Sequence, residues 1–487
     1  MPLLVLVWGL ARLPLALLRL PPLVEHDTFG YRCDLQSISV PPLYGLFLRL
    51  FSPLIAVIVQ HLLVLGAAII WYAIARRAAS RAAGLLAGLA FVLYGEFVVW
   101  GHVLMSETLF LFFIALHLGA LWQAIRFRSI TWYFLAGAFA GCAADVRPVA
   151  QWQVVVVALA LAPFYLSRHH FKGYAVRMAV LFGGCALVLA PAVGRVHQAT
   201  GEIALSNGLA PVVMYRLVGD ETAPLAALPV ADPTLAAIRD YLDEVGRTDY
   251  GAIHYRAFQH IENQLLPRGK NSEKEAYAAV MELWRAYVRH YPWPYLRRSL
   301  AEISATLNAR THLLVEELFS LEVVAQKKAQ WPRPGATFVT CQKKFVAALG
   351  QPAKPDFLEV VTASGLYFTL SGLLGRRFLI FLTLLLGLGV LWRRDRDERI
   401  TALESPGNES TGGHGSAVPK NAARIYWVAV YATLIYLYAP QFFVSIAIMR
   451  YRYPFDLVYF LIFGAAWAKA WQLWREHRAR RLNKSLR

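Results

Sequence analysis

The sequence EHDTFGYRCDLQSISVPPLYGLFLRLFSP, residues 25–53, separates two apolar runs in the amino-terminal part of the chain. The runs cover residues 2–20 and 54–75, and each is long enough to cross a hydrocarbon core of roughly 30 Å. The acids, aromatics and double proline between them therefore belong to a loop at one membrane surface. Ionisable residues where spans meet water indicate a functional site, here centred on Asp27, although such loops also carry charges for solubility alone.

Composition places the whole chain among membrane proteins. Hydrophobic residues make up 57% of its 487 residues, charged residues 16%, and the mean hydropathy is +0.43, which soluble domains do not reach. We therefore predict an all-α polytopic membrane protein with a mainly helical domain outside the membrane. Apolar runs of about 20 residues predict about ten transmembrane helices, near residues 2–20, 54–75, 82–100, 104–124, 131–146, 148–166, 174–193, 364–392, 425–447 and 454–473.

Basic residues predict the orientation, because short loops rich in lysine and arginine stay in the cytoplasm. With ten spans, the basic clusters fall on one face, at residues 76–81, 126–128, 168–172, 393–396 and 475–487. Both termini are then cytoplasmic, and the Asp27 loop is noncytoplasmic. The net charge of +18 reflects this bias and attraction to anionic lipid, so we do not infer nucleic-acid binding from it.

The spans and the long segment between them divide the chain into four predicted parts. These are a transmembrane module of about seven helices at 1–193, with its first outer loop at 21–53; an exoplasmic or periplasmic domain at 194–363; carboxyl-terminal spans at 364–473, with a flexible cytoplasmic linker at 393–424; and a basic cytoplasmic tail at 474–487. Residues 273–290 have helical spacing of apolar side chains, with Ser272 as N-cap. The aromatic residues that follow suit either an interfacial belt or a surface for a lipid headgroup.

The four cysteines fall into two pairs by location. Cys142 and Cys185 lie in predicted spans, where cysteine is a small apolar residue. Cys33 and Cys341 both lie on the oxidising side, so a disulfide could tie the first loop to the outer domain. Location alone does not decide whether they are bonded.

Three acidic or histidine residues near the outer ends of spans are candidates for catalysis. Asp27 can act as a general base toward a hydroxyl or amine arriving from the aqueous side, or it can cap a short helix. Glu107 opens the fourth span, where the helix dipole favours an acid, and His102 lies close before it. Asp27, His102 and Glu107 could together hold a divalent metal ion; alternatively, Glu107 binds the acceptor.

Three arginines lie on the predicted outer face, against the usual bias of basic residues to the inside. Arg147 stands between the fifth and sixth spans, and Arg450 and Arg452 stand in a turn between the last two. A phosphate would compensate them, because the guanidinium fork matches phosphate oxygens. Pairing with Asp145, Glu96 or lipid headgroups is the alternative.

The order of several short motifs resembles integral-membrane glycosyltransferases of the GT-C superfold, in the branch of dolichyl-phosphate-mannose protein mannosyltransferase-like and aminoarabinose-transferase-like enzymes. The motifs are Asp27-Thr28-x-x-Tyr31 with Pro41-Pro42, Ser106-Glu107-Thr108-Leu109-Phe110, Arg147-Pro148, Leu205-Ser206-Asn207-Gly208, His290-Tyr291-Pro292 and Arg450-Tyr451-Arg452-Tyr453-Pro454. The resemblance covers nearly the whole chain. It implies transfer of a sugar, with inversion, from a polyprenyl-phosphate donor to a lipid or glycan acceptor outside the cytoplasm, in a bacterial inner membrane.

The resemblance also implies roles for single residues. Asp27 matches the catalytic acid of the first loop, and Glu107 matches a second acidic position. Tyr31 and His102 are assigned to substrate binding. The arginines at 147, 450 and 452 match basic positions that face the lipid phosphate.

Two departures and one competing function limit what the resemblance implies. Thr28 and Phe29 follow Asp27 where protein mannosyltransferases have a second acid, which argues against protein O-mannosylation. Asp145-Val146 precedes Arg147 where threonine is frequent, so Arg147 could be partly neutralised. A transporter or flippase of a lipid-linked sugar is the alternative function, although transporters often show repeated halves and this chain has no internal repeat.

Overall fold

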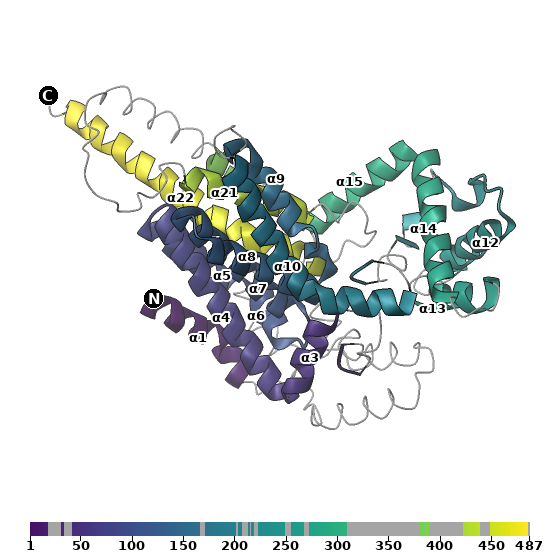
Figure 1. The fold of residues 1–487 in the computed structure, drawn as a ribbon. Coiled ribbons are helices and arrows are strands. Elements are labelled where there is room, and N and C mark those ends of the chain that lie inside the picture. The colour runs from purple at the N-terminus through teal and green to yellow at the C-terminus, as the bar shows by residue number, and fades with distance from the viewer. Residues whose placement is uncertain are drawn as a thin grey trace.

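The computed structural model contains helices, turns and loops, and no β-sheet within the residues it describes (Figure 1). Those residues are 1–17, 31–33, 41–165, 171–200, 203–206, 213–214, 216–218, 223–248, 255–266, 272–308, 379–380, 382–388, 422–438 and 449–485. The expected all-α fold is confirmed.

A bundle of helices forms the body of the protein. Its helices are α1 (Pro2–Leu17), α3 (Pro42–Leu50), α4 (Pro53–Ala78), α5 (Arg81–Leu93), α6 (Gly95–His102), α7 (Glu107–Phe127), α8 (Ile130–Val146), η1 (Pro148–Ala150), α9 (Gln153–Tyr165), α10 (Phe171–Thr200), α21 (Ala422–Tyr438) and α22 (Met449–Ser485). Four segments are long and apolar enough to cross a membrane: Pro53–Ala78, Glu107–Phe127, Pro148–Tyr165 and Phe171–Gln198. Shorter apolar helices accompany them at Pro2–Leu13, Arg81–Leu93, Ile130–Val146 and Ala422–Leu437.

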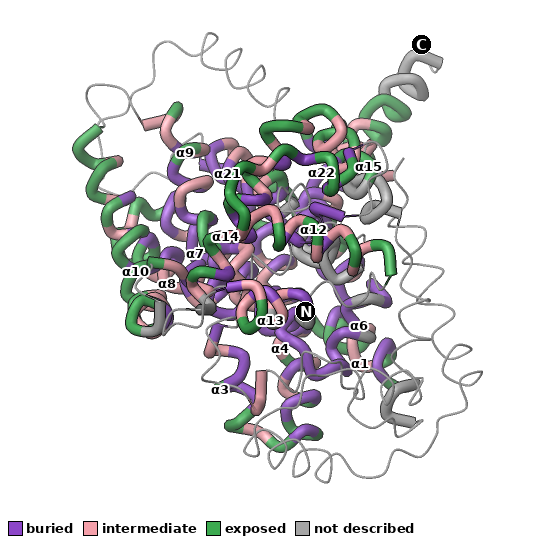
Figure 2. The backbone as a smooth tube through the Cα atoms, turned by 90° about the vertical axis from the view of Figure 1, so that its right-hand side faces the viewer, coloured by how far each residue is buried: buried purple, intermediate pink, exposed green. Residues whose placement is uncertain are grey.

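The outer surface of this bundle is apolar, as a lipid-facing surface must be. Leu159 on α9 and Leu187 on α10 are 68% and 66% exposed, and Leu6 and Leu54 are exposed on α1 and α4. Figure 2 shows much of α10 as exposed, while buried residues gather on the helices inside. Apolar patches of this extent indicate a membrane environment. The chain is thus an integral membrane protein.

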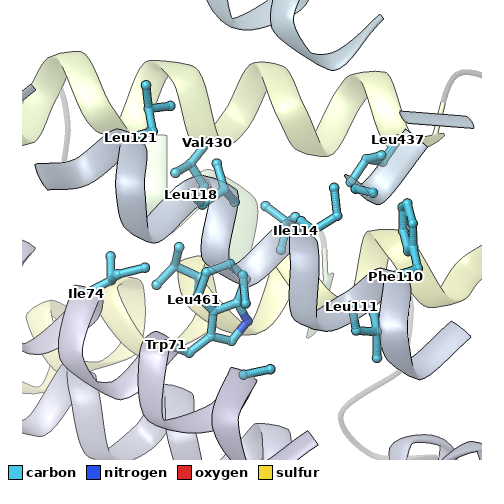
Figure 3. Packing of buried hydrophobic residues seen from close by; sticks show 14 of the residues in the cluster. Trp71, Ile74, Phe110, Leu111, Ile114, Leu118, Leu121, Val430, Leu437 and Leu461 are labelled. Atoms are coloured by element: carbon cyan, nitrogen blue, oxygen red, sulfur yellow. The ribbon is translucent and has the colours of Figure 1, made fainter. Parts of the chain in front are cut away.

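The interior is packed where α4, α7, α21 and α22 meet. Figure 3 shows Trp71 of α4, Ile114 and Leu118 of α7, Val430 of α21 and Leu461 of α22 in one cluster, all buried. Small residues let helices approach closely around it, as is usual in membranes. A Cβ on Gly464 of α22 would collide with the backbone oxygen of Ala83 in α5.

Two sequence expectations about these helices were wrong. The predicted span 82–100 is broken at Tyr94, whose extended backbone separates α5 from α6. The buried Tyr94 ring packs edge-on against Phe97 and against Phe460 of α22, a contact between distant segments that apolar spacing does not reveal. Residues 449–454, expected as a turn, are the first residues of α22. Pro454 is the sixth residue of this helix, where a proline removes one backbone hydrogen bond, and the helix nevertheless continues through it.

A second hydrophobic cluster lies in residues 213–287, separate from that of the bundle. It is built on α12 (Pro233–Thr248), α13 (Tyr255–His260) and α14 (Ser272–His290), and α15 (Pro292–Asn308) follows α14. The helix expected at 273–290 is confirmed; Ser272 is its first residue. The domain boundaries at 193 and 363 stay predictions.

The cysteines are in different chemical states. Cys33 is disulfide-bonded, whereas Cys142 and Cys185 carry free thiols. Cys341, its expected partner, lies outside the described residues.

Candidate active site

The carboxyl end of α8 and the amino end of α7 bring two candidate residues together. Glu107 is the first residue of α7. Arg147 directly follows α8 and has an extended backbone, which is the conformation favoured before a proline such as Pro148. Arg147 Nη1 donates a hydrogen bond to Glu107 Oε1 at 2.6 Å. The sequence marked both residues for separate roles, and the structure joins them in one ion pair.

This ion pair is largely removed from water. The Glu107 side chain is 1% exposed and that of Arg147 is 16% exposed. Oε1 of Glu107 is held by Arg147, but the buried Oε2 has no hydrogen-bond partner among the described residues. A buried carboxylate oxygen without a donor costs about 1–3 kcal/mol or more, so this oxygen is a strong acceptor position within the site.

Tyr31 lies against the residue that precedes Glu107. Its hydroxyl is 3.1 Å from Ser106 Oγ, and its ring packs edge-on against that of Tyr44 in α3, with centroids 5.0 Å apart. The first loop thus contacts the turn that carries Glu107.

A polar network beneath this turn holds it in place. Tyr44 Oη donates to Gln60 Oε1 at 2.8 Å, and Gln60 Nε2 donates to the carbonyl oxygens of Gly101 and Val103 at 3.2 and 2.7 Å. Both side chains are fully buried. Gln60 therefore links α3, α4 and the turn before Glu107. Sequence reasoning missed it, although an uncharged amide inside the apolar run 54–75 was a usable signal.

Burial keeps the Tyr44 hydroxyl protonated. Burial first, and then the negative charge of Glu107, raises the pKa of Tyr44 well above its ordinary value of 10.0. Because the folded-state pKa is the higher one, its contribution to stability is complete below pH 10 and is lost as pH rises above that.

We expect Tyr44→Phe to lower the free energy of unfolding by about 1–3 kcal/mol, because Gln60 Oε1 loses its donor in a buried site. Thermal unfolding of the purified protein at neutral pH and at about pH 11 measures this difference, which should shrink at the higher pH. Tyr72→Phe is the control, since the Tyr72 hydroxyl has no hydrogen bond within the described residues. Equal effects of both variants would contradict the network.

His102 contacts a second histidine that the sequence analysis did not select. His102 Nδ1 is 3.3 Å from His61 Nε2 of α4. No three His, Cys, Asp or Glu side chains gather as a metal site within the described part of the chain. The third member of the expected metal set, Asp27, lies outside that part. The metal site stays a prediction.

The other candidates are placed only in part. Arg450 and Arg452 lie at the start of α22, where the structure describes the backbone but not their side chains. Asp27 falls in residues 18–30, also outside it. The structure thus brings together Tyr31, Glu107 and Arg147, while the contribution of Asp27 and the two arginines remains a prediction.

Comparison with known families gives one match. Residues 39–194, about a third of the chain, match the family model described as dolichyl-phosphate-mannose-protein mannosyltransferase. This segment is therefore similar to membrane glycosyltransferases of the GT-C kind. The matched segment includes His102, Glu107 and Arg147 and begins after Asp27 and Tyr31. No curated protein and no solved structure matches the chain.

Proposed function

We propose that the chain transfers a sugar, with inversion, from a polyprenyl-phosphate donor to a lipid or envelope glycan at the noncytoplasmic face of a bacterial inner membrane. The observation that carries this proposal is the part-buried Glu107–Arg147 pair at the ends of two membrane helices, inside the segment matched by the glycosyltransferase family. A carboxylate and a guanidinium in one water-poor site suit a substrate that presents both hydroxyl groups and a phosphate.

The chemistry of the leaving group sets what the residues must do. A departing lipid phosphate is stable as an anion, so it needs positive charge more than it needs a proton donor. Arg147 supplies that charge, with Arg450 and Arg452 as further phosphate ligands. The acceptor hydroxyl attacks the anomeric carbon from the opposite face of the sugar, the bond to the phosphate oxygen breaks, and Asp27 takes the hydroxyl proton.

Glu107 has a double task in this proposal. Through Oε1 it orients Arg147, because an ion pair of 2.6 Å restricts the guanidinium. Through Oε2, which has no donor among the described residues, it accepts a hydrogen bond from a substrate hydroxyl. Two further residues complete the proposed substrate site. The Tyr31 hydroxyl lies beside Ser106, the residue before Glu107, and His102 is five residues before Glu107 in the sequence.

Arg147→Lys is expected to keep the positive charge and lose the planar fork that holds Glu107 and phosphate together. Loss of one charge-assisted contact costs on the order of 1.5–3 kcal/mol, which is about a ten- to hundredfold weaker use of donor. The measurement is sugar transfer by the purified protein in nanodiscs with a polyprenyl-phosphate sugar. Arg450→Lys tests the second phosphate position in the same assay. Unchanged transfer in both variants would assign these arginines to headgroup anchoring.

The proposed orientation predicts which residues an impermeant reagent reaches. A cysteine introduced at Ser272 should be labelled in intact cells, whereas one at Ser416, in the predicted cytoplasmic linker, should react only after lysis. The parent chain, with its own thiols, is the control for background labelling. Labelling at 416 without labelling at 272 would reverse the orientation and remove the noncytoplasmic site.

A transporter or flippase of a lipid-linked sugar remains the second candidate. It is favoured by the same phosphate-binding arginines, since a carrier must also bind the lipid phosphate. The two functions differ in one measurable outcome. A glycosyltransferase breaks the bond between sugar and phosphate, whereas a transporter leaves it intact.

A further inference from the structure

Helix α15 has two chemically different faces. One face is bound to its own domain: Tyr295 Oη accepts a hydrogen bond from Trp284 Nε1 at 3.3 Å, and Arg298 Nη1 donates to the Val218 carbonyl at 2.7 Å. Ser299, fully buried, lies on that face too. The opposite face carries Trp293 and Leu300, which are 74% and 53% exposed.

The exposed residues of α15 form a continuous apolar stripe. Trp293, Leu296 and Leu300 follow each other at spacings of three and four, which places them on one side of a helix. Arg297 is exposed beside this stripe, and Arg289 and His290 are exposed at the end of α14, just before it. An apolar stripe flanked by basic residues is typical of helices that lie in the interface of a membrane.

The position of α15 also fits a membrane surface. Figure 1 shows α15 running from the end of α14 back to the bundle, where it meets α22 at the end opposite the carboxyl terminus. α15 contacts α22 directly. The predicted last span begins near the amino end of α22, so the predicted membrane surface lies where α15 meets the bundle.

We infer that α15 is an interfacial helix, with Trp293, Leu296 and Leu300 inserted at the boundary between headgroups and acyl chains of the surrounding phospholipid and Arg297 bound to lipid phosphate. Of the aromatic residues that suggested either a belt or a headgroup surface, Trp293 faces outward, whereas Tyr295 packs toward the domain. This contact holds residues 272–308 on the membrane beside the bundle. It does not depend on the reaction that the protein catalyses.

Nitroxide labels on the full-length protein in nanodiscs of phosphatidylglycerol and phosphatidylethanolamine test this inference. Labels are attached to Leu300→Cys and, as control, to Glu282→Cys on the exposed side of α14, with Cys142 and Cys185 replaced by alanine. Oxygen dissolves in lipid, while a water-soluble nickel chelate does not. We expect the ratio of oxygen to nickel collisions to be roughly tenfold higher at 300 than at 282.

The other outcomes would each overturn the inference. Free access of both reagents to residue 300 would place the stripe in water. Exclusion of both would mean that a protein surface, such as a second copy of the chain, covers the stripe.

Arg297→Glu should raise nickel access at 300, because it replaces attraction to lipid phosphate by repulsion.

Discussion

Asp27→Asn is expected to lower the rate of sugar transfer by at least about a hundredfold, the contribution of a general base. The change preserves the size of the side chain and most of its hydrogen bonding, but it removes the basic carboxylate. Donor affinity should change little, because the arginines and the lipid chain determine it. The measurements are transfer and donor binding by the purified protein in nanodiscs.

The same loop offers a matched control for this prediction. Asp34→Asn removes a second carboxylate of the loop and should leave transfer within a few-fold of the parent protein, in line with ordinary surface changes. A transporter that used Asp27 to bind cargo would lose affinity instead of turnover. Full transfer by Asp27→Asn would exclude Asp27 as the base and leave Glu107 as the next candidate.

Glu107→Gln is expected to affect both folding and transfer. The variant removes the charge-assisted hydrogen bond between Arg147 and Glu107, which costs on the order of 1.5–3 kcal/mol of stability. It also removes the acceptor oxygen that we assign to a substrate hydroxyl, so transfer should fall about ten- to hundredfold. Thermal unfolding and transfer rate, measured on the same preparation, record the two effects.

The double variant Glu107→Gln with Arg147→Met distinguishes a structural role of the Glu107–Arg147 pair from a catalytic role. Removing both charges should recover much of the stability lost by Glu107→Gln, because no uncompensated charge remains buried. Transfer should stay low, because phosphate has lost Arg147. Recovery of transfer together with stability would show that the pair only supports the fold.

The amino-acid sequence was sufficient for several of the long apolar helices, because a long apolar run has few other stable arrangements in a membrane. The expected span 54–75 appears as Pro53–Ala78, and 131–146 as Ile130–Val146. The break at Tyr94 could not be predicted. The Tyr94 ring packs against Phe460, more than three hundred residues away, and helix propensity does not report such contacts.

The site was predictable as a set of residues but not as a geometry. Position at a span end identified Glu107 and Arg147, yet their ion pair depends on how α7 and α8 pack, so the sequence analysis gave them separate roles. Gln60 and His61 were missed because both lie in the middle of a run that was interpreted only as a span. Polar residues inside such runs are worth treating as candidates, since each must find a partner.

Under the proposed function, the protein breaks the bond between a sugar and a lipid phosphate. Proteoliposomes that contain only this chain, an acceptor lipid extract and a polyprenyl-phosphate sugar labelled in both sugar and phosphate test it directly. We expect labelled polyprenyl phosphate to accumulate as labelled sugar appears, with opposite anomeric configuration, on an acceptor. Movement of the intact donor between leaflets without formation of polyprenyl phosphate would contradict it and identify a flippase.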